Sequence, residues 1–157
     1  MNKILLLITL YSLVFSYYRY YTTNIDNKEF TFKANDIIEE DTNLSHSKIT
    51  AENIDDICLL ITDGRLNIHK GVTISKIVPQ SNVNNFLKDK GDNFNESDNY
   101  IYGLTSCIVA IGENTKVHIE NIIIYIDSPF SNAIVALNGA RIYIKNTTII
   151  TTKKKVL

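Results

Sequence analysis

The chain has 157 residues, with 16 basic and 17 acidic side chains and a formal net charge of -1 at pH 7. This near balance lacks the excess positive charge of a nucleic-acid-binding protein, so no nucleic-acid partner is expected. With only 2 prolines and 6 glycines and with no tryptophan, the chain is rich in Ile, Val, Thr, Tyr and Asn, which is typical of β-structure with polar turns. Its length is that of one domain.

The first segment has the pattern of a secretory signal peptide. Lys3 precedes the apolar run ILLLITLYSLVF, and Val14 and Ser16 stand where small residues precede a cleavage point. We therefore predict a signal peptide over residues 1–16 and a secreted, extracellular or cell-surface protein with no stable membrane span after cleavage. An uncleaved membrane anchor is the alternative, but a run of about 15 residues is shorter than the roughly 20 that cross a bilayer.

The segment after the signal peptide shows no repeat. Residues 17–50 are predicted to be an irregular leader or N-terminal cap ahead of the main domain at residues 51–157. Asn43 and Asn95 each begin an Asn-X-Ser triplet in an expected loop, which makes them candidate glycosylation sites of a glycoprotein. Chance is the alternative, because a chain so rich in Asn and Ser produces such triplets often.

Two segments near the end of the chain have nearly the same sequence. SCIVAIGENTKVHIENIIIYI covers residues 106–126, and NAIVALNGARIYIKNTTIITT covers residues 132–152. They align apolar to apolar and turn to turn at a spacing of about 25 residues, the length of one coil in a stacked β-solenoid. A looser third copy, ICLLITDGRLNIHKGVTISKI, covers residues 57–77.

Each copy predicts a strand, a tight turn, an alternating strand, a corner and a short third strand. In KVHIE the apolar Val117 and Ile119 alternate with polar residues, which indicates a strand with one buried face. Stacked coils would pair each strand with its counterparts above and below and bury a continuous core. The aligned Asn121 and Asn146 are predicted to form an asparagine ladder at an inward corner, with two ordinary turn asparagines as the alternative.

A polar segment separates the first copy from the second. PQSNVNNFLKDKGDNFNESDNY, residues 79–100, shows almost no periodicity, so a long loop is expected there. Its carboxylates could supply oxygen ligands to Ca²⁺, although their spacing is not that of an EF-hand. The candidate ligands are Asp89, Asp92, Glu96 and Asp98. A solvated surface loop is the alternative, and no other cofactor is indicated.

The two cysteines are a candidate disulfide. Cys58 and Cys107 open corresponding apolar strands, one residue out of register in the aligned copies. If the long loop leaves their coils adjacent, their Cα atoms could approach the separation of about 5.5 Å that a disulfide needs. An oxidising compartment would favour the bond. Two free, buried cysteines are the alternative.

Aromatic and basic side chains on the predicted outer surface could bind carbohydrate. Tyrosine and phenylalanine can stack on apolar surfaces of a ligand, and cations can pair with acidic sugars. The candidates are Tyr100, Tyr102, Tyr125, Phe130, Arg141, Tyr143 and Lys145. The alternative is that these residues line strand surfaces without binding anything.

The repeats support a resemblance to a known family. The combination of LITDGRLNIHKGVTISK, a long loop, YGLTSCIVAIGENTKVHIENIIIY and SNAIVALNGARIYIKNTTIITT resembles secreted right-handed parallel β-helix proteins of the pectate-lyase-like (pectin lyase-like) fold. More narrowly, it is similar to carbohydrate-binding β-helix repeat proteins and to passenger domains of autotransporter adhesins. The resemblance covers roughly residues 51–152, and it implies the right-handed coil, which the periodicity alone does not give.

We therefore predict an all-β protein, a single-stranded right-handed parallel β-helix of roughly four to five short coils. The expected function is non-catalytic binding or adhesion, with a polysaccharide or cell-surface glycan as partner. A polysaccharide lyase or hydrolase is the alternative, although the carboxylate clusters that such enzymes of this fold use do not recur in successive copies. A C-terminally truncated fragment without activity is a further alternative, and unpaired strand edges at the open end of the coil predict self-association.

Overall fold

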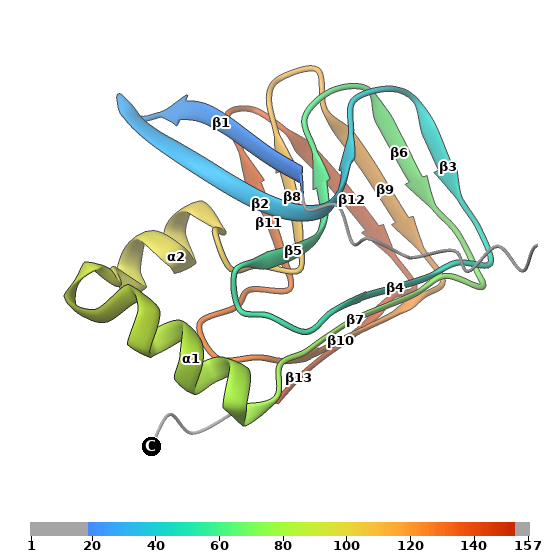
Figure 1. The fold of residues 1–157 in the computed structure, drawn as a ribbon. Coiled ribbons are helices and arrows are strands. Elements are labelled where there is room, and N and C mark those ends of the chain that lie inside the picture. The colour runs from blue at the N-terminus through green and yellow to red at the C-terminus, as the bar shows by residue number, and fades with distance from the viewer. Residues whose placement is uncertain (1–18, 153–157) are drawn as a thin grey trace, which may run out of the picture.

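The structure is a computed structural model that describes residues 19–152, and it consists of three β-sheets with two α-helices (Figure 1). The first sheet contains β1 (Arg19–Ile25), β2 (Lys28–Ile38), β5 (Asp56–Ile61), β8 (Ile108–Ile111) and β11 (Ile134–Leu137) in that order. The second sheet contains β3 (Thr42–Leu44), β6 (Arg65–Ile68), β9 (Lys116–Glu120) and β12 (Arg141–Lys145). The third contains β4 (Lys48–Ala51), β7 (Thr73–Ile77), β10 (Ile123–Asp127) and β13 (Thr148–Thr152).

The chain visits the three sheets in turn, so three consecutive strands form what we call a strand layer. The first layer is β2, β3 and β4, the second is β5, β6 and β7, and the third is β8, β9 and β10. The terminal layer is β11, β12 and β13. Neighbouring layers pair in parallel, with Ile134 opposite Ile108 and Ile108 opposite Leu59. The register of the two later repeats agrees with their alignment, whereas the first repeat pairs one residue away from the register that its alignment predicts.

A core of aliphatic side chains runs between the three sheets. Alternate residues of each strand point inward, as the period-two pattern requires. In the third layer Ile119 and Ile124 are 1% and 0% exposed, and Ile68 and Ile74, which lie opposite them in the second layer, are both 0% exposed. Burying one such side chain stabilises the folded state by about 1.5–3 kcal/mol. The stacked isoleucines therefore hold successive layers together.

The first two strands of the first sheet form a β-hairpin that packs against the outer face of β5 and β8. Strands β1 and β2 run antiparallel and are joined by Asp26 and Asn27, whose φ angles are 52° and 64°. Two consecutive left-handed residues are typical of a type I′ hairpin turn, and Asp and Asn tolerate that conformation well. The hairpin places the buried Phe30 and Phe32 against Val109 in a second apolar cluster.

Two helices lie where a long loop was expected. They are α1 (Gln80–Lys90) and α2 (Glu96–Tyr102), joined through a 3₁₀ turn at Gly91–Asn93. On α1 the apolar Val83, Phe86 and Leu87 recur at helical spacing. Val83 is 1% exposed and packs in a third cluster with Ile54 and Val78, which fixes the helix to the sheets. No helix within residues 19–152 has the length and apolar character needed to cross a membrane.

The predicted fold class is wrong in two respects. The described chain is a mixed α/β structure with two helices, and β1 runs antiparallel to β2, which makes the first sheet mixed. The all-β, single-stranded right-handed parallel β-helix therefore does not describe it. The expected irregular leader over residues 17–50 instead supplies strands from residue 19 onward. The predicted signal peptide, residues 1–16, lies outside the described residues.

The corner asparagines have a backbone role. Asn121 and Asn146 follow Glu120 and Lys145, which lie opposite each other, so both corners occupy the same register. Their φ angles are 58° and 46°, in the left-handed region that Asn enters more readily than most residues. Both residues are exposed, so the inward asparagine ladder is not formed. The alternative of ordinary turn asparagines describes them better.

Candidate functional site

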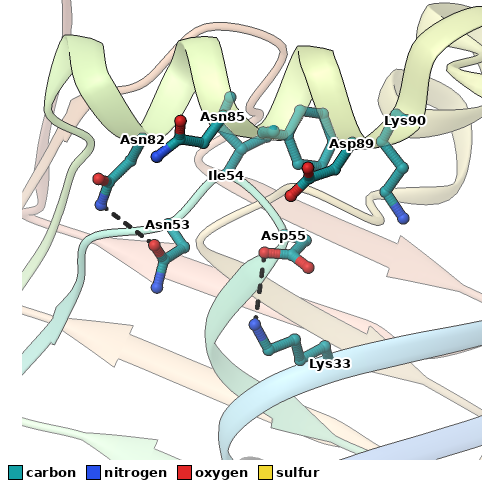
Figure 2. Close-up of a pocket in the computed structure, with 9 residues that line it drawn as sticks. Lys33, Asn53, Ile54, Asp55, Asn82, Asn85, Asp89 and Lys90 are labelled. Atoms are coloured by element: carbon teal, nitrogen blue, oxygen red, sulfur yellow. Dashed lines mark hydrogen bonds and ion pairs between the residues drawn. The ribbon is translucent and has the colours of Figure 1, made fainter.

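A polar groove separates α1 from the start of β5 and from β2. It encloses about 390 Å³, and Figure 2 shows helix α1 on one side of it and Asn53, Asp55 and Lys33 on the other. Its lining residues are Lys33, Asn53, Ile54, Asp55, Asn82, Asn85, Phe86, Asp89 and Lys90. A second cavity of about 390 Å³ shares Lys33, Asp55, Phe86 and Lys90 with it and continues toward the β1–β2 hairpin.

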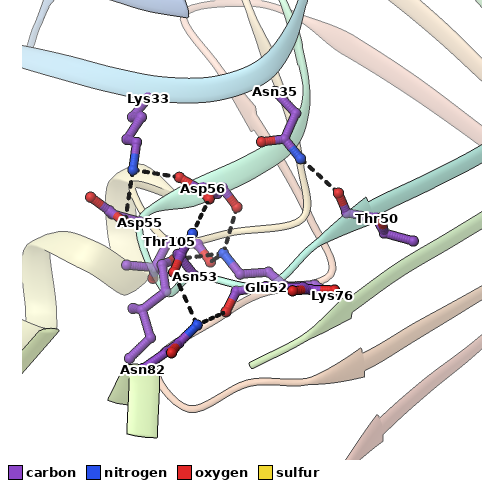
Figure 3. A network of polar contacts seen from close by, with 11 residues as sticks. Lys33, Asn35, Thr50, Glu52, Asn53, Asp55, Asp56, Lys76, Asn82 and Thr105 are labelled. Atoms are coloured by element: carbon purple, nitrogen blue, oxygen red, sulfur yellow. Dashed lines mark hydrogen bonds and ion pairs between the residues drawn. The ribbon is translucent and has the colours of Figure 1, made fainter. Parts of the chain in front are cut away.

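Lys33, on the β2 side of this groove, is paired with two carboxylates. Lys33 Nζ lies 2.7 Å from Asp56 Oδ1 and 3.5 Å from Asp55 Oδ1. Asn53 Nδ2 donates to Asp56 Oδ2 at 2.7 Å, and Asn82 Nδ2 donates to Asn53 Oδ1 at 3.1 Å (Figure 3). Lys33 is therefore held between two carboxylates instead of being presented to a ligand. The network fixes α1 and β2 to the start of β5, which is a structural task.

A buried lysine lies beneath the groove. Lys76 is 0% exposed, and its ammonium donates to the carbonyl oxygens of Ile54, Asp56 and Thr105 at 2.6, 2.8 and 2.7 Å (Figure 3). Burial lowers its pKa from 10.5 to about 8, against the attraction of nearby thiols and carboxylates. Lys76 thus ties the starts of β5 and β8 together where the helical segment leaves the layers. The inward position of Lys76 could be predicted from the sequence, because residues two apart on a strand point to the same side and Ile74 points inward.

The two cysteines lie side by side in the core. Leu59 pairs with Ile108, so Cys58 and Cys107 occupy the same register instead of being one residue apart, as the aligned repeats indicated. Both are free and fully buried, and Cys107 Sγ donates to Cys58 Sγ at 3.2 Å. This hydrogen bond lowers the pKa of Cys58 and raises that of Cys107, while the Lys76 ammonium favours the thiolate of either. The disulfide stays a prediction.

The proposed carbohydrate-binding residues are not brought together. Arg141, Tyr143 and Lys145 share the outward face of β12, where Tyr143 stacks on His118 with ring centroids 4.7 Å apart. Lys145 Nζ lies 3.0 Å from Glu120 Oε1 and lowers the pKa of that carboxyl group. Of the rest, Tyr125 lies on β10, Tyr100 and Tyr102 lie on α2, and Phe130 is 9% exposed in the cluster that holds α1.

The candidate calcium ligands are also dispersed. Asp89 lines the groove from α1, Asp92 lies in the 3₁₀ turn, and Asp98 on α2 pairs with Lys28 of the hairpin. Glu96 is exposed in the first turn of α2. Among the residues that the structure describes, no three His, Cys, Asp or Glu side chains gather closely enough to hold a metal ion.

The candidate glycosylation sites have local structural partners. Asn43 on β3 is exposed, and its Oδ1 accepts a hydrogen bond from Asn67 Nδ2 at 2.8 Å. Asn95 caps α2, because its side chain accepts a hydrogen bond from the backbone N–H of Asp98 at 3.1 Å. Both residues remain on the surface, and no observation on the described chain bears on glycan attachment.

The terminal layer differs from the other layers in exposure. Ile144 on β12 lies opposite Ile119, yet it is 48% exposed where Ile119 is 1% exposed. Ile149 on β13 lies opposite Ile124, and their exposed fractions are 41% and 0%. Strands β11, β12 and β13 each pair on one side only within the described residues. Inward-type apolar side chains and strand edges without a neighbour among the described residues are thus combined on one surface.

Searches for relatives find no matching protein family, curated protein or solved structure. The resemblance to the pectate-lyase-like β-helix proteins is therefore wrong, since no family matches and the described fold is mixed α/β. The predictions of carbohydrate binding and adhesion, and those of a signal peptide, secretion and glycosylation made from other segments, have no support in the described residues. A functional proposal therefore has to rest on the geometry of the described residues.

Proposed function

We propose that this protein is a non-catalytic binding protein that receives additional β-strands on its terminal layer. The proposal rests on a difference in exposed fraction between two isoleucines that lie opposite each other. Ile144 is 48% exposed and Ile119 is 1% exposed, although they lie opposite each other on neighbouring strands of one sheet. A further strand laid on β12 would give Ile144 the environment that Ile119 already has.

The free edges of β11, β12 and β13 explain why strands are the expected ligand. An edge strand presents unpaired N–H and C=O groups that another chain can pair with, and main-chain hydrogen bonds then supply much of the affinity. Here three such edges lie next to one another on one layer. Burying apolar area adds about 25 cal/mol for each Å² removed from water. Both terms favour an extended partner over a compact small molecule.

The contacts in the polar groove favour a structural role for its side chains over a catalytic role. Lys33, one of its two lysines, is shared between Asp55 and Asp56, and Asp56 also accepts from Asn53 at 2.7 Å. Groups engaged with one another in this way stabilise the contact of α1 with the sheets. A catalytic acid or base must instead lie within hydrogen-bond reach of a substrate proton.

A strand-layer peptide tests the proposal. A synthetic peptide with the sequence of residues 107–127, Cys107 replaced by serine, carries the strands with which β11, β12 and β13 already pair on their inner side. We expect it to bind the full chain and to slow amide hydrogen exchange in the terminal layer. Ile144→Lys should weaken binding by about tenfold or more, because the added charge would be buried without a partner.

A matched variant distinguishes binding at the strand edges from non-specific hydrophobic association. Ile123→Lys introduces the same charge at a residue that is 54% exposed and points outward from β10, away from the terminal layer's core. It should leave peptide affinity unchanged. Absence of binding by the unmodified chain, or equal loss in both variants, would contradict the proposal.

A further inference from the structure

We propose that the strand layer received by the terminal layer is the first layer of a second copy of this chain. This inference rests on the proposed function and names its partner. The first layer also has open edges, because β3 and β4 each pair on one side only among the described residues. Within residues 19–152, strand β1 pairs with β2 from Lys28 to Ala34.

The register of the molecule predicts how two copies would meet. Ile144 lies opposite Ile119, Ile119 opposite Ile68, and Ile68 opposite Leu44. Continuing the same stacking by one step places Leu44 of the next copy opposite Ile144. In the third sheet the equivalent series runs from Ile149 to Ile49.

Both ends contribute apolar side chains to such a contact. Leu44 and Ile49 are only partly buried against the core from the first layer, and Ile142 is partly buried from the terminal layer. Ile144 and Ile149 are 48% and 41% exposed. Stacking would therefore bury an isoleucine on a leucine in the second sheet and an isoleucine on an isoleucine in the third. These are the pairings that already stabilise the interior layers.

Opposite charges favour contact of the terminal layer of one copy with the first layer of the next, an arrangement that we call head-to-tail. Residues 36–41 contain Asp36, Glu39, Glu40 and Asp41, and the whole stretch of residues 132–152 contains two cations and no acidic residue. The cations are Arg141 and Lys145. A tail-to-tail contact between two terminal layers would instead bring cations from both copies together, and like charges placed opposite each other are destabilising.

One pair of charges lies in matching register. Arg141 lies opposite Lys116, and Lys116 lies opposite Arg65. The next position in this series is Asp41, whose Oδ1 accepts a hydrogen bond from the backbone N–H of Arg65 at 2.7 Å. Stacking a second copy thus brings its Asp41 next to Arg141. Because the two surfaces differ and the contact does not close on itself, the product is a linear series of copies.

A charge exchange tests the inference with the full chain. Analytical ultracentrifugation of the unmodified protein should show association that grows with concentration, without a fixed end size. Arg141→Asp alone and Asp41→Arg alone should each weaken association by about tenfold or more, because either change sets like charges against each other. An equimolar mixture of the two variants should recover association, since every contact between unlike variants again joins opposite charges.

Two further measurements make the outcome decisive. Lys88→Asp makes the same charge change at an exposed position on α1 and should leave association unaltered. Circular dichroism of each variant checks that the exposed substitutions leave the fold intact. A monomer at all concentrations, or a mixture that does not recover, would overturn the head-to-tail contact. If the protein did not self-associate but still bound the 107–127 peptide, the proposed function would be retained and only the second copy would be excluded as the partner.

Discussion

Cys107 donates its thiol hydrogen to Cys58 across two adjacent parallel strands, with 3.2 Å between the two sulfur atoms. Because the strands are in register and the thiols are already in contact, a disulfide needs little backbone movement. We expect refolding in oxidised glutathione to join them, with release of two molecules of reduced glutathione for each bond formed. Intact mass should fall by about 2 Da once the reduced chain is converted.

The bond should also stabilise the protein. It would close a loop between residues 49 positions apart, which in the chain-entropy view raises the free energy of unfolding by about 4 kcal/mol as an upper value. Urea unfolding of oxidised and reduced protein measures the difference. Cys107→Ala is the control, since it should show no response to glutathione. Two titratable thiols remaining after oxidative refolding would count against the pairing.

The two later repeats predicted their strand register because each is a short sequence with its own alternation and turn, whereas the looser first copy was aligned one residue out of register with the second. Ile134 opposite Ile108 follows directly from the aligned copies. The first layer escaped detection because β2 is shared between a hairpin and the stack, so its sequence does not resemble the later copies. The Asp26 and Asn27 turn was the signal for that hairpin.

The helices were missed because polar residues mask their apolar spacing. On α1 the residues Val83, Phe86 and Leu87 stand among asparagines and charges, and the segment was interpreted as a loop. The position of the polar groove followed from where that helix docks and could not be predicted without it.

Replacing Lys76 with methionine should destabilise the fold. The ammonium donates to three carbonyl oxygens, at 2.6, 2.8 and 2.7 Å, and is 0% exposed. Removing it relieves a net cost of burying the charge of about 3 kcal/mol, from the lowered pKa, but each carbonyl left unpaired costs about 1–3 kcal/mol. The three carbonyls together cost about 3–9 kcal/mol, so Lys76→Met should lower the free energy of unfolding, by up to about 6 kcal/mol. Lys70→Met, at an exposed position, is the matched control in urea unfolding.

Lys76 should also make stability depend on pH. Its pKa is about 8 in the folded state and 10.5 as the reference, so between these values the unfolded chain binds more protons. Stability therefore rises with pH in that window, because the cost of burying the charge is fully present below about pH 8 and disappears toward pH 10.5. The difference in unfolding free energy between the unmodified chain and Lys76→Met, measured from pH 7 to pH 10.5, isolates this contribution. A flat difference would contradict it.

Val83 should anchor α1 to the sheets. It is 1% exposed and packs with Ile54, Val78 and Phe130. Val83→Ala removes buried methyl groups and leaves a small cavity, which should lower the free energy of unfolding by about 2 kcal/mol. Ser81→Ala, at an exposed position on the same helix, should change it little. Equal effects of the two substitutions would mean that α1 contributes no packing energy.

Amide hydrogen exchange should distinguish the terminal layer from the layer beneath it. Strands β9 and β12 share a sheet and a register, but within residues 19–152 β9 has a neighbour on both sides and β12 on one only. In dilute protein the outward-facing amides of β11, β12 and β13 are open to water, so we expect them to exchange at least about tenfold faster than those of β8, β9 and β10. At high concentration a stacked second copy would cover the same edges, and protection should rise there first. If Arg141→Asp abolishes that rise while leaving exchange in dilute protein unchanged, the protection arises from contact between copies, because a substitution that merely loosened β12 would also speed exchange in dilute protein.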